Sequence, residues 1–166
     1  MGLRDTLLPE FDQEMAATRR VLERLPANAL DWRPHPKSFD LGSLATHLAQ
    51  IPRWGLSILK QHEHDMASSD DARAVRLERV EDVLRAFDDH VRDVRAAIVE
   101  AADGLLETPW TLRRGAHIVL SMPRIGALRA FLVHHSIHHR GQLTVYLRMQ
   151  DVPLPPLYGP TADERM

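Results

Sequence analysis

The chain has 166 residues, 44% hydrophobic and 27% charged, the balance of one soluble globular domain spanning residues 1–166. Its formal net charge of −2 gives no reason to expect a nucleic-acid or acidic-membrane partner, and the absence of Cys excludes disulfides, thiolate ligands and a protein thiol nucleophile. No stretch reaches the ~18 apolar residues of a membrane span or forms a signal peptide, so we expect a cytoplasmic protein.

Four segments repeat apolar residues at three- and four-residue steps, the spacing of amphipathic helices. They cover residues 3–25, 41–64, 77–103 and 123–150. Pro26 ends the first segment, Pro52 is expected to kink the second, and Pro123 suits the first turn of the fourth. The sequence therefore predicts four long helices.

The connections differ in character. Residues 31–37 hold two prolines and predict a loop, and residues 66–76 are polar and predict an exposed loop. Residues 110–122, interrupted by Gly115, suit extended chain, which we interpret as a crossover segment with a short hairpin rather than a core sheet. The proline-rich tail after Gln150 predicts irregular chain along the surface. The predicted fold is all-α, a four-helix bundle with a long crossover before the last helix.

Histidine is the compositional outlier, with ten residues, four of them clustered in the fourth predicted helix. With about 100° of rotation per residue, His135 and His139 fall in the middle of the main apolar stripe of that helix. His134 and His138 fall on its flank, toward solvent or a neighbouring chain. The inner pair is therefore predicted to face the core and the outer pair is not.

Two buried imidazoles one turn apart are costly unless something organises them. A divalent metal does so, because residues at i and i+4 present two ring nitrogens to one point. The alternative is a pair of hydrogen-bonded core histidines without a metal. Three histidines without a carboxylate would form a neutral ligand set with open coordination positions, suited to zinc, nickel, iron or cobalt.

A third ligand must come from another helix, and His47 in the second predicted helix is the best candidate. It lies about 60° to one side of the apolar stripe, whereas His62 shares that face but sits near the helix end. Geometry alone does not settle the choice. The remaining histidines are predicted in or beside loops, on the flank of the third helix or in the crossover: His35, His64, His90 and His117.

Other residues near the predicted site could serve either the site or the packing of the helices. Gln142, one turn after His139, either hydrogen-bonds a ligand or metal-bound water, or is a packing amide. Trp54 and Tyr146 either line a pocket or belong to the core. Arg140 is predicted about 120° from the apolar stripe, as a structural ion-pair residue. Gly141 lowers helix stability unless another backbone approaches closely.

Three stretches of the chain resemble the DinB/YfiT-like family of metalloenzymes. Residues 135–143 (HSIHHRGQL) are similar to its signature, and residues 41–48 (LGSLATHL) with Trp54 are similar to its second-helix motif. Residues 147–153 (LRMQDVP) and the proline-rich run to Tyr158 and Gly159 also fit. The resemblance spans essentially the whole chain.

The resemblance implies a four-helix bundle with a metal site whose ligands map onto His47, His135 and His139. It also implies that water or substrate completes the coordination, that the protein is a homodimer, and that a low-molecular-weight thiol takes part in transfer to, or isomerisation of, a small electrophile. We therefore expect a metal-dependent enzyme with a small-molecule substrate, zinc or nickel being favoured over iron or cobalt. Two alternatives stay open, a metal-dependent hydrolase and a metal-binding bundle without turnover.

The far side of the fourth predicted helix is apolar as well, so it belongs either to the bundle centre or to a homodimer interface. The residues that form it are Ala130, Val133, Ile137, Gly141 and Leu147.

Overall fold

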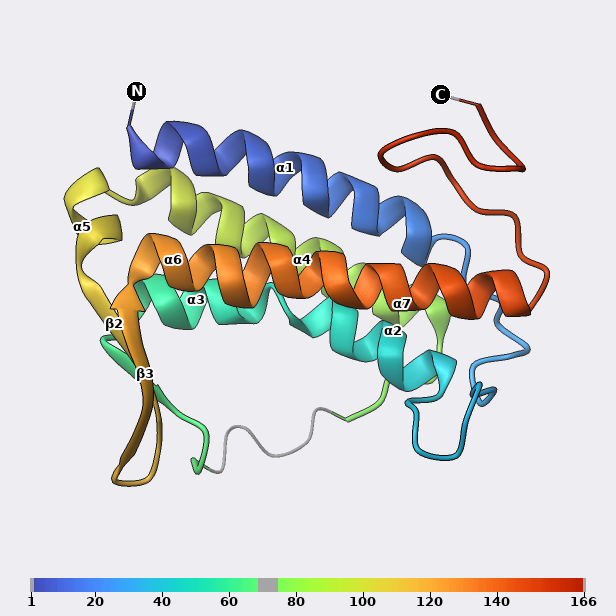
Figure 1. Cartoon of the computed structure of the whole chain (residues 1–166), viewed down its shortest axis with the longest axis horizontal. Helices are drawn as coiled ribbons and strands as arrows, with labels where there is room; N and C mark the ends of the chain where they lie inside the picture. Colours follow the sequence, from blue (N-terminus) through green and yellow to red (C-terminus); the bar gives the residue numbers. More distant parts are fainter. Residues whose placement is uncertain (1, 69–74, 166) are drawn as a thin grey trace.

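The computed structural model describes residues 2–68 and 75–165, and the helices pack as a bundle (Figure 1). The first three long elements are α1 (Leu3–Leu22), α2 (Leu41–Gln50) with α3 (Arg53–Lys60), and α4 (Val80–Glu100). The last runs through α6 (Arg124–Leu128), the π-helical η2 (Arg129–His134) and α7 (His135–Met149). Among the described residues, no helix is long and apolar enough to cross a membrane.

Figure 1 shows α1 and the α6–α7 helix running one way along the bundle, and α2, α3 and α4 running the other way. The long connection before the last helix, residues 101–123, stays at one end of the bundle. It contains the short helix α5 (Asp103–Glu107) and the strands β2 (Pro109–Arg114) and β3 (His117–Pro123). The predicted bundle with a long connection before its last helix is therefore confirmed.

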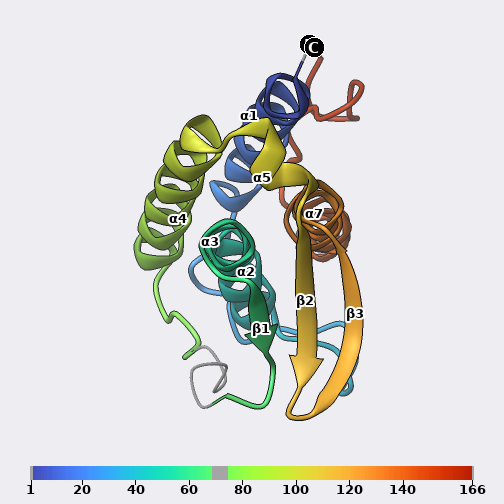
Figure 2. The same cartoon turned by 90° about the vertical axis from the view of Figure 1, so that its left-hand side faces the viewer.

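The predicted hairpin is confirmed and has a third strand that the sequence did not indicate (Figure 2). Strands β2 and β3 pair antiparallel around a turn at Gly115, whose φ of +58° suits glycine. Strand β1 (Glu63–Asp65) pairs parallel to β2. The prediction of helix up to His64 was therefore wrong, because residues 63–65 find backbone partners in β2.

The second predicted helix is broken into two helices near Pro52 and is not merely kinked there. Helix α2 ends at Gln50, and Pro52 is the N-cap of α3. Past this break, Gly55 lies so close to α4 that an added Cβ would be 2.7 Å from a methyl carbon of Val94. The break lets each half of the segment pack against α4 separately.

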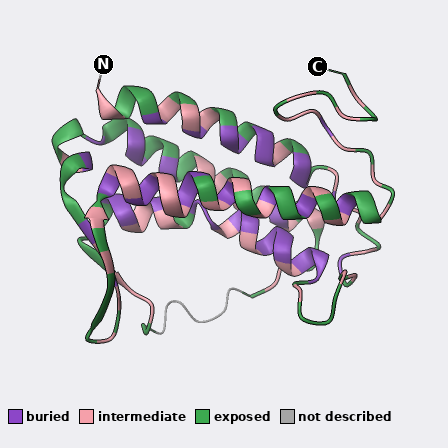
Figure 3. Cartoon of the chain, viewed as in Figure 1, coloured by how far each residue is buried: buried purple, intermediate pink, exposed green. Residues whose placement is uncertain are grey.

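The core lies between the inward faces of the helices (Figure 3). Its largest fully buried apolar side chains include Phe11 in α1, Phe87 in α4 and Trp110 in β2. Trp110 lies near the start of β2, so the sheet contributes to the core at this end. Arg124, which directly follows β3, connects this end of the sheet to the end of α3. It donates hydrogen bonds to the carbonyl oxygens of Ile58 and of Gln61, the latter at 2.6 Å.

The π-helical segment η2 changes which face of the last helix is buried. A π-helical turn holds more residues than an α-helical turn, so the residues after η2 are rotated relative to a continuous α-helix. The buried positions along α6, η2 and α7 are Arg124, Ala127, Leu128, Leu132, Val133, Ser136, Arg140, Leu143 and Leu147. The prediction that His135 and His139 occupy the middle of the buried stripe was wrong, because both rings are half-buried at its edge.

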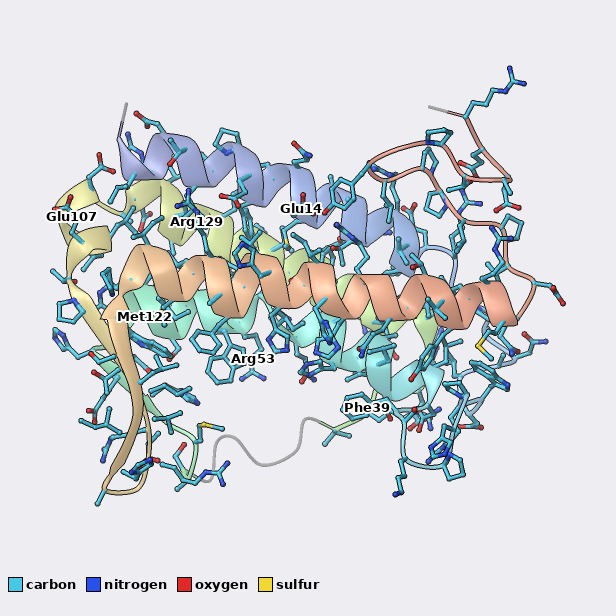
Figure 4. The ribbon with its side chains drawn as sticks, viewed as in Figure 1. Glu14, Phe39, Arg53, Glu107, Met122 and Arg129 are labelled. Atoms are coloured by element: carbon cyan, nitrogen blue, oxygen red, sulfur yellow. The ribbon has the colours of Figure 1, made fainter. Side chains whose placement is uncertain are left out.

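Arg140 is fully buried rather than turned away from the core, although its predicted role in an ion pair is confirmed. It lies 2.6 Å from the Glu14 carboxylate and also donates to the Glu14 carbonyl and the Thr18 hydroxyl. The Tyr158 hydroxyl donates to the same carboxylate at 2.6 Å. Figure 4 shows Glu14 on the side of α1 that faces α7 and the C-terminal tail. This cluster fastens the irregular tail to the bundle.

The loop predicted over residues 66–76 lies partly outside the described residues. Residues 66–68 form a turn after β1, and residues 75–79 lead into α4. Leu77 is held by α2, because its backbone N–H donates to the Thr46 hydroxyl at 2.9 Å.

Candidate metal centre

Three imidazoles from two helices converge on one point. His135 Nε2 lies 3.3 Å from His47 Nε2 and 2.9 Å from His139 Nε2. Nitrogens that share a tetrahedral zinc ion at about 2.0–2.1 Å lie about 3.3 Å apart. Within residues 2–68 and 75–165, this is the only group of three His, Asp or Glu side chains close enough to hold one ion.

The hydrogen bonds on the other ring nitrogens favour free lone pairs at this point. His139 Nδ1 lies 2.7 Å from Gln142 Oε1, an oxygen that only accepts, so Nδ1 donates and Nε2 keeps its lone pair. His135 hydrogen-bonds the backbone of Phe131 in η2. Partners of this kind orient histidines that bind metals.

Burial favours the neutral form of the three rings. Burial, followed by repulsion from His139 and His135, lowers the pKa of His47 to about 4. Burial also lowers the pKa of His135 and that of His139 below the usual value of 6.5. Neutral imidazoles with converging lone pairs are an unfavourable arrangement that a cation would relieve, so the donor set fits a divalent metal.

The start of α2 places His47 in this cluster. The Asp40 carboxylate caps the helix by accepting a hydrogen bond from the Ser43 backbone at 2.7 Å. Further along, His90 Nδ1 of α4 bonds the Ala49 carbonyl at 2.9 Å. The Phe39 ring stacks on the His47 ring with a centroid distance of 6.0 Å. Helix α2 is thus held at both ends with His47 turned toward α7.

A groove of about 350 Å³ opens beside the cluster. The loop before α2 forms one wall, and α7 forms the other. Its lining residues are Lys37, Ser38, Phe39, His139, Gln142 and Tyr146. Access through the groove would leave coordination positions open to a small molecule.

The residues predicted around the site separate into two groups. Gln142 is exposed and bonds His139, and Tyr146 lines the groove with its ring against Trp32 at 5.7 Å. Trp54 is not among the lining residues and instead contacts the rings of Phe131 and His64.

The other histidines lie outside the cluster. His134 and His138 are exposed, as predicted for the outer pair. His62 is exposed beyond the end of α3, and His90 serves the contact between α4 and α2.

Sequence reasoning missed residues 37–39 as part of the site. Lys37 is the last residue of the loop predicted over residues 31–37, and Ser38 and Phe39 follow it, directly before the Asp40 cap. Their position before the helix that carries His47 is the signal that places them near its N-terminal end.

Comparison with known proteins identifies relatives. A family model described as the DinB family matches residues 1–165. The uncharacterized protein YrdA of Bacillus subtilis is 26% identical over 163 residues, which cover 96% of this chain and 90% of YrdA.

Solved structures with the same fold come from Bacillus species. The DinB-like protein YjoA of Bacillus subtilis is 19% identical with a TM-score of 0.69 and covers 92% of this chain and 97% of its own. A DinB-like protein of Bacillus cereus is 20% identical with a TM-score of 0.68, over 91% and 95% of the two chains. YfiT of Bacillus subtilis, "a probable metal-dependent hydrolase with an unusual four-helix bundle topology", is 15% identical with a TM-score of 0.67, over 89% and 87%.

Proposed function

Because this chain belongs to the DinB family and three of its imidazoles converge, we propose that it is a divalent-metal-dependent enzyme acting on a small electrophilic molecule. The observation that carries the proposal is the approach of His47 Nε2 and His139 Nε2 to His135 Nε2. These three residues would hold the ion. When bound, it would supply a Lewis acid with open coordination positions.

The protein's own groups would prepare the site in three ways. Gln142 holds the His139 ring so that Nε2 faces the ion position. The Phe131 backbone does the same for His135. Phe39, whose ring stacks on His47, would help to hold the His47 ring in place.

We propose a low-molecular-weight thiol as the co-substrate. The resemblance noted above supports this choice, and a thiol would have to come from outside a chain that has no Cys. The groove beside His139 offers the thiol and its electrophile a place to meet. Zinc or nickel suits three imidazole ligands, with iron or cobalt next.

Metal-dependent hydrolysis is the second candidate, favoured by the description of YfiT. Hydrolysis needs a general base near the attacking water. Among the residues that the structure describes no carboxylate lines the groove, and no Glu or Asp is adjacent to His135 or His139 in sequence. This composition favours the thiol reaction over hydrolysis.

Metal content and turnover together test the proposal. Protein purified without a nickel column is expected to contain about one divalent ion per chain by elemental analysis. Incubation with a panel of thiols and electrophiles, and with ester and amide substrates, then separates the candidates. Thiol-dependent product supports the leading one, and thiol-independent hydrolysis supports the second. An intact metal without turnover would leave a metal-binding bundle.

We also propose that the protein is a homodimer that uses the exposed side of α7. Gly141, Val145 and Met149 share this side, and the two larger side chains are 57% and 55% exposed. An added Cβ at Gly141 would meet nothing within 4 Å, so no contact with the described part of the chain explains a glycine there. Size-exclusion chromatography with light scattering tests this proposal, and a clean monomer at micromolar concentration would contradict it.

A further inference from the structure

Lys37 lines the groove beside the histidine cluster, and among the described residues no acidic side chain lines it. We infer that it binds a small organic anion, with the Lys37 ammonium group pairing with a carboxylate at the end of the molecule remote from the metal. This inference rests on the proposed metal site and names the class of substrate or co-substrate for it.

Charge balance is the first argument. Three neutral imidazoles would leave the two positive charges of a divalent ion uncompensated. Lys37 adds a third positive charge at the same groove. A site with excess positive charge raises the local concentration of anions.

The charge of Lys37 is also available for a ligand. Among the described residues, no carboxylate forms an ion pair with Lys37, and its backbone N–H bonds His35 Nδ1. The nearby Asp40 is already used, because it caps α2 and pairs with Arg33 at 3.2 Å. By contrast, Arg19 and Arg95 each lie within 3 Å of a carboxylate.

The remaining lining suits a short ligand with both polar and flat apolar parts. Ser38 and Tyr146 bring hydroxyl groups, and the Gln142 amide keeps its N–H donors once its oxygen has bonded His139. The Phe39 and Tyr146 rings, supported by His47 and Trp32, form apolar walls. At about 350 Å³ the groove fits a metabolite-sized molecule.

The chain offers a matched control, because its two lysines are Lys37 and Lys60. Lys60 is exposed at the end of α3 and does not line the groove. Each of the variants Lys37→Gln and Lys60→Gln therefore removes one positive charge. Lys37→Gln removes it from the groove, and Lys60→Gln removes it from another part of the surface.

The test is calorimetric titration of zinc-loaded protein with 3-mercaptopropionate and with 3-mercapto-1-propanol, which differ in the charged end. We expect the wild type to prefer the anion, and Lys37→Gln to reduce this preference about fivefold. Lys60→Gln should leave the preference unchanged, and Lys37→Arg should largely retain it. Circular dichroism checks that every variant is folded.

Each outcome decides the inference. Equal preference in the wild type and Lys37→Gln, with zinc present by elemental analysis, would overturn the anion site and leave the proposed metal centre standing. An equal loss in Lys60→Gln would overturn it too, since the effect would then come from overall charge. A wild type that binds no metal would overturn the proposed function and the anion site together.

Discussion

Helix α7 carries two polar clusters on neighbouring faces, and they differ in how their hydrogen bonds and charges are completed. Arg140 donates hydrogen bonds to a carboxylate, a carbonyl and two hydroxyl groups, so its positive charge is paired and its N–H groups are hydrogen-bonded within the chain. His135 and His139 directly precede the buried residues Ser136 and Arg140. Their Nε2 atoms approach a third imidazole, that of His47, and the cluster contains no carboxylate. A completed cluster stabilises the fold, whereas a cluster of this second kind is expected at a binding site, here the proposed metal centre.

Breaking the completed cluster should have the largest effect on stability. Glu14→Ala leaves the Arg140 charge buried without a partner, and we expect a loss of about 3–5 kcal/mol in the free energy of unfolding. Urea denaturation measures this loss. Asp12→Ala is the control on the same helix, because Asp12 pairs with Arg95 in an exposed ion pair and should lose under about 1 kcal/mol. Equal losses would contradict the contrast between buried and exposed pairs.

Removing the partner of a histidine should weaken the incomplete cluster without affecting the fold. Gln142→Ala is expected to lower zinc affinity about tenfold, because the His139 ring loses the acceptor that orients it. Its free energy of unfolding in EDTA should stay close to that of the wild type, since Gln142 is exposed. Competition titration with a chelating dye measures the affinity. Gln13→Ala, an exposed glutamine of α1, should change neither quantity.

Acid should destabilise the metal-free protein through the incomplete cluster. The pKa of His47 is lowered to about 4 in the folded state, so between about pH 6.5 and pH 4 the unfolded chain binds more protons there. Stability therefore falls as the pH falls through this window and is unaffected by these groups above it. We expect a loss of about 1 kcal/mol between pH 7 and pH 5, after allowance for partial exposure of the ring.

Urea denaturation at several pH values in EDTA checks this dependence. His47→Ala should make it shallower, and His134→Ala, which removes an exposed histidine, should not. An unchanged or steeper loss of stability with falling pH in His47→Ala would contradict the assignment of the acid sensitivity to the cluster.

The smallest expected effect concerns the exposed side of α7. Gly141→Ala should raise the stability of a monomer by about 0.5–1 kcal/mol, because the added methyl group meets open space in a helix. Gly55→Ala should do the opposite, since its Cβ would collide with Val94. If the proposed dimer uses Gly141, light scattering will show weaker association of Gly141→Ala. Unchanged association would place the interface elsewhere.

The sequence predicted the fold well where local patterns decide the structure. Apolar periodicity and prolines located the helices, and Gly115 located the hairpin. Strand β1 was missed because its pairing with β2 joins residues far apart in the chain. The π-helical segment was missed because the sequence of residues 129–134 is compatible with an ordinary α-helix.

The candidate site was predicted in part for similar reasons. The spacing of His135 and His139 depends on one helix, so it was visible directly. The approach of His47 depends on how two helices pack, and geometry alone left this residue open until the family resemblance supported it. Lys37 and Phe39 reach the groove only through the path of their loop, which no helical or strand periodicity describes.

The zinc affinity of His47→Ala, compared with that of His134→Ala, tests the central claim most directly. If the three imidazoles form a metal centre, His47→Ala should bind zinc at least about 100-fold more weakly than the wild type, and His134→Ala should bind it normally. Elemental analysis of both variants gives the occupancy. Full occupancy and unchanged affinity in His47→Ala would contradict the account.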